Sequence, residues 1–283
     1  MSGTRYWIDG SESAGLDPGN RALHYGDGVF ETFCVRAGVP AYLDTHFQRL
    51  KAGCARLQLA FDDWSGLESE IRRRAQESGE AVLKVILARG AGARGYRFDP
   101  AQAVTRIVSS AALPVPPSDH ATQGVRVRLC DLRLGLQPAL AGIKHLNRLE
   151  QVLARAEWRD EYAEGLMLDC NGALIEGTMS NLFLVRDSVL LTPRLDGCGV
   201  AGVMRSVLIE LAARQGIEVQ RRQLLSADLA TVDELFVCNS LIGIWPVVAV
   251  GERFAFGVGA VTQRLQHALS HDDGCRGVVW YNE

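Results

Sequence analysis

The chemistry open to this sequence depends first on its lysines, of which there are only three: Lys51, Lys84 and Lys144. Lys51 falls on the exposed side of a predicted helix and is best interpreted as a surface charge. Lys84 interrupts the apolar run VLKVILA, which is typical of a partly buried lysine that extends to solvent or pairs with an acid. Lys144 stands in GIKHLNRLE at the predicted start of a helix, where the positive end of the helix dipole would lower the pKa of an amine. A neutral amine is the nucleophile that forms a Schiff base, so Lys144 is the candidate catalytic residue.

A second candidate site lies in CGVAGVMR, residues 198–205, where a glycine-containing turn leads into a predicted helix. The backbone N–H groups of Val203 and Met204 would lie in the first turn of that helix, which is a favourable place for a phosphate. Glycines also precede helices for packing alone, so the pattern by itself is weak. Arg49 in HFQRL and Ser240 in CNSLIG could add further donors to a bound phosphate.

Two further segments carry polar groups in unusual settings. Glu176 ends a predicted strand inside the apolar hairpin IEGTMSNLF, so its carboxylate needs a partner. That partner could be the protonated ring nitrogen of a cofactor or a structural salt bridge. The loop RGAGARGYR, residues 89–97, lacks the pattern of a phosphate-binding loop, and it is better interpreted as a flexible loop that presents Arg94 and Tyr96 to a carboxylated substrate.

The elements that position these residues follow from the hydrophobic pattern. Strands are predicted at residues 6–8, 29–35, 81–88, 125–132, 165–169, 174–176, 181–185, 189–192 and 234–237. Helices are predicted at residues 43–59, 64–77, 146–159, 203–215 and 259–269. The run 81–88 suggests a strand buried on both faces, and the basic run 72–74 suggests a solvated helix face.

A proline-rich stretch, residues 114–124, predicts a linker between two domains. We therefore expect a small N-terminal α/β domain at residues 1–113 and a larger domain at residues 125–283. The many short strands predict a mixed α/β protein with a largely antiparallel sheet.

Composition excludes several classes of function. The 30 basic and 33 acidic side chains nearly balance, which disfavours a nucleic-acid partner. No apolar run suggests a secretory signal or a membrane helix. Seven scattered cysteines, none in a C-x-x-C pair, predict neither a disulfide framework nor a metal site, and most of them are expected to be buried. A cytoplasmic protein is the expectation.

Taken in order, these segments resemble the fold type IV pyridoxal-phosphate (PLP) enzymes, a group that includes branched-chain and D-amino-acid aminotransferases and aminodeoxychorismate lyases. The resemblance begins at HYGDGVFET, residues 24–32, and continues through HFQRL, GIKHLNRLEQVLAR, EGTMSNLF and GVAGVMR, so it covers nearly the whole chain. It implies a small α/β N-terminal domain, and a larger PLP-binding C-terminal domain built on a mostly antiparallel, barrel-like sheet.

The resemblance also implies roles for individual residues. Lys144 is similar to the Schiff-base lysine, and Glu176 to the partner of the pyridine nitrogen. The implied cofactor-binding residues are Arg49, Lys144, Glu176, Asn181, Val203, Met204 and Ser240. The implied substrate-binding residues are Phe30, Arg94, Tyr96 and Arg148. No metal is implied.

Within the group, KHLNRLEQVLAR and GARGY most resemble the lyases. The tyrosine and glycine pair that usually follow the lysine of branched-chain aminotransferases are absent, and Arg94 and Tyr96 stand where D-amino-acid aminotransferases carry an Arg-x-His clamp. The implied reaction converts 4-amino-4-deoxychorismate to 4-aminobenzoate and pyruvate, a step of folate biosynthesis, in a homodimer. An aminotransferase acting on D-amino or branched-chain amino acids is the alternative.

Overall fold

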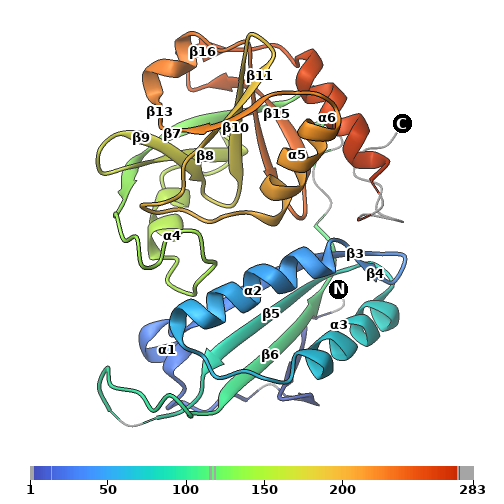
Figure 1. Cartoon of the computed structure of the whole chain (residues 1–283), viewed down its shortest axis with the longest axis vertical. Helices are drawn as coiled ribbons and strands as arrows, with labels where there is room; N and C mark the ends of the chain where they lie inside the picture. The colour runs from blue at the N-terminus through green and yellow to red at the C-terminus, as the bar shows by residue number, and fades with distance from the viewer. Residues whose placement is uncertain are drawn as a thin grey trace. The chain divides into compact units, whose positions relative to one another are not determined.

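The chain divides into two compact units (Figure 1). The computed structural model describes residues 3–13, 15–92, 94–114, 117, 119–272 and 274. Unit 1 contains Met1–Pro114 together with Ile143–Asn147, and unit 2 contains Val115–Gly142 together with Arg148–Asp272. Residues 115, 116 and 118 of the predicted linker lie outside the described residues.

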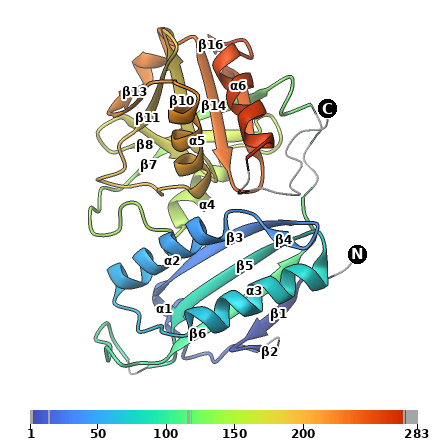
Figure 2. The ribbon, with the colours of Figure 1, turned by 45° about the vertical axis from the view of Figure 1, so that its right-hand side comes forward.

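Unit 1 is built on a six-stranded sheet in the order β2-β1-β6-β5-β3-β4, in which every pair of neighbours is antiparallel. Its strands are β1 (Arg5–Ile8), β2 (Ser11–Glu12), β3 (Gly28–Arg36), β4 (Val39–Pro40), β5 (Ala81–Arg89) and β6 (Val104–Ala111). Its helices are α1 (Arg21–Tyr25), α2 (Leu43–Leu57) and α3 (Trp64–Ser78). Figure 2 shows α2 and α3 side by side along one face of this sheet.

Alternation along the central strands explains this arrangement, because successive strand side chains point to opposite faces. Phe33 of β3 and Leu83 and Val85 of β5 are fully buried, and they share a core with Leu50 of α2 and Leu67 of α3. The alternate residues of β5 are only half-buried. The expectation that β5 is buried on both faces is therefore wrong: one face packs on the helices and the other does not.

The predicted solvated face of α3 also needs a correction. Arg72 is exposed, but Arg74 is buried, and its guanidinium carbon lies 4.0 Å from the centroid of the Trp7 ring. Arg74 also pairs with Glu77 at 3.0 Å. A long arginine stem can cover an aromatic side chain while its charged end keeps a partner, which a charge pattern alone does not reveal.

Unit 2 contains the larger sheet, ten strands in a nearly closed, barrel-like arrangement with the order β12-β11-β10-β14-β15-β7-β8-β9-β13 and with β16 beside β15. Its strands are β7 (Val125–Leu134), β8 (Glu164–Asp169), β9 (Ala173–Gly177), β10 (Asn181–Arg186), β11 (Val189–Pro193), β12 (Val219–Arg222), β13 (Leu224–Leu225), β14 (Glu234–Asn239), β15 (Gly243–Val250) and β16 (Phe254–Ala255). The pairs β11–β12, β7–β8 and β7–β15 are parallel and the others antiparallel. The predicted mixed α/β fold with a mostly antiparallel, barrel-like sheet is confirmed.

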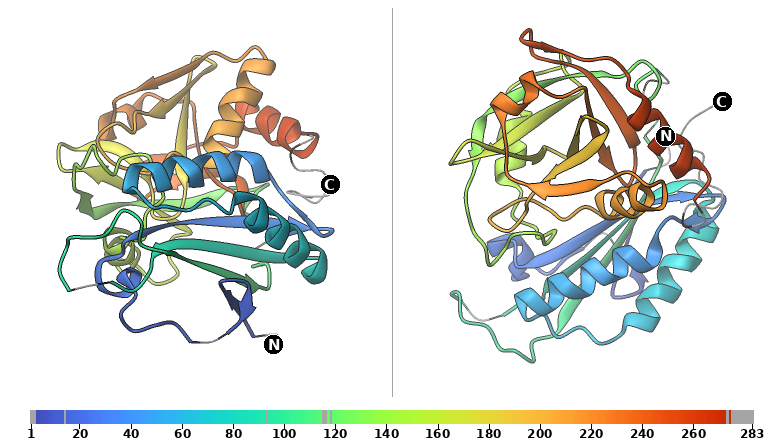
Figure 3. Two further views of the ribbon diagram at one scale, coloured as in Figure 1. Left: turned by 60° about the horizontal axis from the view of Figure 1, so that its bottom comes forward. Right: turned by 45° about the horizontal axis from the view of Figure 1, so that its top comes forward.

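The helices of unit 2 are α4 (Leu149–Arg155), the 3-10 helix η1 (Ser226–Ala230), α5 (Val203–Arg214) and α6 (Ala260–Ser270). Helices α5 and α6 lie side by side (Figure 3). Helix α4 is much shorter than the helix predicted at residues 146–159. Its apolar residues Leu149, Val152 and Leu153 are exposed within the chain, so their helical spacing does not mark a core face here.

Five of the described cysteines are buried, as expected, and Cys170 is exposed. Burial raises the pKa of the Cys54 and Cys238 thiols to about 12. Cys275 lies outside the described residues. No helix in the described part of the chain is long and apolar enough to cross a membrane.

Candidate active site

Lys144 is fixed in unit 1 by backbone contacts with strand β3. The N–H of Phe30 donates to the Lys144 carbonyl at 2.9 Å, and the N–H of Leu146 donates to the Gly28 carbonyl at 3.0 Å. His145 forms a β-bridge with Val29 between these two contacts. Residues 144–146 therefore run along β3 as a short extra strand, which sets the position of the lysine backbone.

The Phe30 ring lies close to two lysines. Lys144 Nζ is 4.4 Å from the ring centroid, and Lys84 Nζ is 4.8 Å from it, within the range of cation–π attraction. Partial burial lowers the pKa of Lys84. No acid among the described residues forms an ion pair with Lys84, so the interpretation of Lys84 as a lysine paired with an acid is wrong. The ring of Phe30, predicted as a substrate contact, thus lies near both amines.

Lys144 does not lie at the start of a helix, so the predicted effect of a helix dipole on its amine is wrong. Helix α4 begins at Leu149, five residues after Lys144, and the dipole acts only within about one turn of a helix end. Arg148, predicted as a substrate contact, is the residue that precedes the first turn of α4, and it belongs to unit 2.

Arg49 of α2, predicted to bind phosphate, is held by a carboxylate from the neighbouring strand. Its Nε and one terminal nitrogen donate to the two oxygens of Glu31 at 2.7 and 2.6 Å. His46, one helical turn earlier, lies 2.6 Å from the same carboxylate through its Nδ1 atom. Neither Glu31 nor His46 was identified from the sequence.

The glycine-rich loop after β5 is anchored by its backbone rather than by its predicted ligands. Buried Arg21 donates to the carbonyls of Gly95 and Tyr96 at 2.9 and 3.2 Å. The Tyr96 side chain is 85% exposed, and Arg94 is exposed and forms no ion pair with any described residue. The substrate-binding role of Arg94 and Tyr96 stays a prediction.

In unit 2, Glu176 binds a backbone donor. Its Oε2 atom accepts from the N–H of Val200 at 2.7 Å, and its Oε1 atom accepts from Gln151 Nε2 at 3.3 Å. Glu176 lies on β9 and is 4% exposed. A carboxylate has about four acceptor positions, so it can also accept from a further N–H.

Asn181 at the start of β10 binds the carbonyl of the same residue, Val200. Its Nδ2 atom donates to the Val200 carbonyl at 2.8 Å. Glu176 and Asn181 therefore fix the turn that ends at Gly202, the residue before α5. A Cβ at Gly202 would overlap Asn181 Oδ1, which explains the glycine.

Helix α5 begins as predicted. Val203 and Met204 are its first two residues, and no side chain caps its N-terminus. Their N–H groups have no partner within the helix and lie at the positive end of the dipole, where an anion is stabilised.

Ser240 follows directly after β14, in a turn organised by Asn239. The side-chain oxygen of Asn239, Oδ1, accepts from the N–H groups of Leu241 and Ile242 at 2.8 and 3.0 Å. β14 pairs with β10, and Asn181 lies opposite Cys238. The end of β14 that carries Ser240 is therefore next to the end of β10 that carries Asn181.

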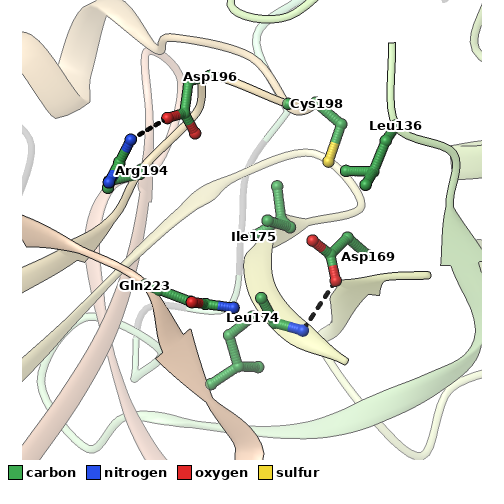
Figure 4. A pocket seen from close by; sticks show the side chains of 10 residues that line it. Leu136, Asp169, Leu174, Ile175, Arg194, Asp196, Cys198 and Gln223 are labelled. Carbon is green, nitrogen blue, oxygen red and sulfur yellow. Dashed lines mark hydrogen bonds and ion pairs between the residues drawn. The ribbon is translucent and has the colours of Figure 1, made fainter. Parts of the chain in front are cut away.

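A cavity of about 310 Å³ in unit 2 is separate from these residues (Figure 4). Its walls include Cys198 and Ile175, the residue before Glu176. They also include Arg194 and Asp196, which form an ion pair. None of the predicted site residues lines it.

The sequence contained a signal for one of the missed residues. Alternation along β3 places Glu31 with Val29 and Phe33 on the buried face, where a carboxylate needs a partner. HFQRL supplies His46 and Arg49 at helical spacing. Val200, by contrast, acts through its backbone, which leaves no signature in residue type.

The chain belongs to the family described as amino-transferase class IV, whose model matches residues 28–250. It is 35% identical to an aminodeoxychorismate lyase of Vibrio harveyi, over 94% of this chain and 99% of that protein. A solved structure of 4-amino-4-deoxychorismate lyase from Pseudomonas aeruginosa is 47% identical, with a TM-score of 0.91, and covers 95% of this chain and 99% of that one. A putative branched-chain-amino-acid aminotransferase of Methanocaldococcus jannaschii is 31% identical over 93% of each chain.

Proposed function

We propose that this protein is a PLP-dependent lyase that converts 4-amino-4-deoxychorismate to 4-aminobenzoate and pyruvate, in folate biosynthesis. The observation that carries the proposal is the similarity to aminodeoxychorismate lyases along almost the whole length of both chains. The identity to the Pseudomonas enzyme, 47%, exceeds the 31% to the putative branched-chain aminotransferase.

The donor set suits PLP. The cofactor has an aldehyde, a pyridine nitrogen and a phosphate, which require an amine, a carboxylate and a group of N–H donors, respectively. Lys144 is the amine and Glu176 the carboxylate. Asn181 supports the turn beside Glu176. The proposed phosphate donors are the N–H groups of Val203 and Met204, the guanidinium of Arg49 and the hydroxyl of Ser240.

PLP, when bound, provides the electron sink that makes a proton on the neighbouring substrate carbon acidic. Lys144 then acts as general base on the carbon that bears the substrate nitrogen. As the ring carbon–oxygen bond to the enolpyruvyl group breaks, Lys144 returns the proton to the methylene carbon of that group, which leaves as pyruvate. A positioned general acid/base accelerates such a step by roughly 10²- to 10⁴-fold. In the proposal, the buried carboxylate of Glu176 accepts a hydrogen bond from the ring nitrogen and so favours its protonated form. Loss of the enolpyruvyl group leaves an aromatic ring, which supplies much of the driving force.

The substrate carries two carboxylates, which call for cations near Lys144. Lys84 is partly buried beside the same Phe30 ring as Lys144, and we propose it as one carboxylate ligand. Arg94, Arg148 and Tyr96 remain proposed ligands of the substrate. Their contributions can be separated by single substitutions and the KM of each variant.

A rate comparison tests the proposal against the aminotransferase alternative, which the 31% identity to a putative aminotransferase supports. The PLP-loaded enzyme is given 4-amino-4-deoxychorismate in one reaction, and D-alanine or leucine with 2-oxoglutarate in others. We expect release of 4-aminobenzoate to be far faster than amino transfer. Faster amino transfer would replace the lyase assignment with that of an aminotransferase.

Bound cofactor has its own test. Borohydride should fix PLP on the peptide that contains Lys144, and the Lys144→Ala variant should lose the visible absorbance of the bound cofactor. A protein that ignores added PLP would contradict the proposal at its first step. The proposal also includes a homodimer in the cytoplasm, and light scattering on the purified protein would test the dimer.

A further inference from the structure

Glu31 is a carboxylate at a position where the fold calls for an apolar residue. It lies on the face of β3 that packs against α2, between Val29 and Phe33, and its side chain is 1% exposed. Removing a charge from water costs several kcal/mol unless the charge is fully partnered. Glu31 receives two hydrogen bonds from Arg49 and a third contact from His46.

The charges of this cluster are settled by its surroundings. Burial alone would raise the pKa of Glu31, but the charge and hydrogen bonds of Arg49, together with His46, outweigh burial and lower the pKa to about 2. Burial lowers the pKa of His46, and Arg49 and Lys144 lower it further, against the opposing effect of Glu31. His46 is therefore neutral, with its proton on Nδ1 and donated to Glu31.

The unused nitrogen of His46 supports this arrangement. His46 Nε2 is buried and has no hydrogen-bond partner among the described residues, and the ring lies 4.5 Å from the Phe33 ring, centroid to centroid. The imidazole therefore has a single polar contact, which it makes to Glu31. Its role in the cluster is to orient that carboxylate.

Glu31 in turn orients Arg49. A contact through Nε and a terminal nitrogen fixes the plane of the guanidinium, because both oxygens of the carboxylate are engaged at once. The Arg49 side chain is 12% exposed, whereas those of Glu31 and His46 are each 1% exposed. The arginine is thus the member of the cluster that reaches the surface.

The same strand also holds the catalytic lysine. Phe30, the residue before Glu31, donates its N–H to the Lys144 carbonyl at 2.9 Å. One strand therefore sets both the backbone of Lys144 and, through Glu31, the guanidinium of Arg49. A fixed relation between an amine and a cation is what a ligand with an aldehyde and a phosphate requires.

We propose that Glu31 and His46 are positioning residues, which hold Arg49 in the orientation that binds the phosphate of PLP. This inference rests on the proposed function. Stability alone does not explain the cluster, because a buried ion pair usually adds no more stability than apolar residues of the same volume. The function that we assign to the cluster is to orient the guanidinium of Arg49.

The test separates the phosphate from the rest of the cofactor by comparing PLP with pyridoxal, which lacks the phosphate. The dissociation constants of both are measured by absorbance titration of the full chain, freed of cofactor, for the parent and for Glu31→Gln. We expect Glu31→Gln to weaken PLP binding roughly 10- to 100-fold, because a charged hydrogen-bond network is lost. Pyridoxal binding should change less than about twofold.

Glu70→Gln is the matched control, since Glu70 is also a buried acid of unit 1 and pairs with Arg106 at 3.1 Å. This control should lower the melting temperature and leave the ratio of the two dissociation constants unchanged. Equal weakening of PLP and pyridoxal in Glu31→Gln would overturn the inference and would leave the proposed function intact. If the parent binds neither ligand, the proposed function itself fails, and the inference with it.

His46→Gln provides a second variant should Glu31→Gln not fold. It removes the imidazole contact and keeps the ion pair of Glu31 with Arg49. We expect a weakening of PLP binding of a few fold, with no change for pyridoxal. A PLP affinity equal to that of the parent would remove His46 from the proposal, and equal losses for both ligands would overturn it.

Discussion

Replacing Gly202 with alanine should damage the turn before α5 through one contact, and that contact can be isolated. The φ of Gly202 is −63°, which alanine adopts without strain, so backbone conformation does not require glycine here. The obstacle is steric. A new Cβ would overlap Asn181 Oδ1 and crowd Asn181 Cγ, whereas the nearest atom of another described residue, Arg205 Cβ, would lie at an ordinary 3.6 Å.

The magnitude follows from what Asn181 must give up when it moves. Its Nδ2 donates to the Val200 carbonyl at 2.8 Å, and loss of such a hydrogen bond in a mostly buried site costs about 1–2 kcal/mol. Asn181→Ala removes the same bond and the obstructing oxygen. In that background, Gly202→Ala should be neutral, or stabilising by about 0.5 kcal/mol through the entropy of the unfolded chain.

The assay is a double-mutant cycle on cofactor-free protein, with the melting temperature and the PLP dissociation constant as readouts. The free energy of unfolding should fall by about 1–2 kcal/mol in each single variant. In the double variant it should fall by no more than in Asn181→Ala alone. Both single variants should also weaken PLP binding, because the turn positions the N–H groups of Val203 and Met204. Additive losses of stability in the double variant would show that Gly202 and Asn181 act independently, so that Asn181 is not the obstacle to a Cβ at position 202.

Three further predictions follow. Lys84→Met should raise the KM for 4-amino-4-deoxychorismate about tenfold with a smaller change in kcat, whereas Lys51→Met, on an exposed position, should match the parent; steady-state kinetics decide this. Arg74→Ala should destabilise unit 1 by about 2 kcal/mol, because a buried side chain is lost, and Arg72→Ala on the exposed face should cost less than about 0.5 kcal/mol in thermal or urea unfolding. The pKa of Glu31 is lowered to about 2 in the folded protein, so the ionised carboxylate stabilises the fold fully above about pH 4.5. This stabilisation is lost as the pH falls toward 2. The melting temperature of Glu31→Gln should therefore fall less than that of the parent between pH 4.5 and pH 2.

Much of the fold could be predicted from the sequence because its central elements have clear periods. Strand β3 is rich in Val, Phe and Thr, and α2 repeats its apolar residues every three or four positions, so both were predicted to within a few residues. β6 and β15 were not predicted. β6 is only half-buried over most of its length, and β15 contains Pro246, which argues against a strand.

For helix α4 the apolar period is present, but it does not mark a buried face, because Leu149 and Leu153 are exposed within the chain. A period shows that a helix has an apolar face, but not that the same chain covers it.

Some residues of the candidate site could be predicted from the sequence and others could not. Lys144, Glu176 and the start of α5 could be identified because residue type or a glycine-rich turn marks them. The contacts that hold them could not, since they join residues distant in sequence. Glu31 meets Arg49 across a strand and a helix, and Val200 is held through its backbone on both sides. Such partners become visible only when the chain is folded.

The most direct test of the central claim is the release of 4-aminobenzoate from 4-amino-4-deoxychorismate by the PLP-loaded parent and by Lys144→Ala. Both proteins are first shown to be folded by circular dichroism. We expect rapid release by the parent and a loss of at least about 10²-fold in Lys144→Ala, because the variant lacks the general acid/base. Release by Lys144→Ala at the rate of the parent would show that Lys144 is not the catalytic residue.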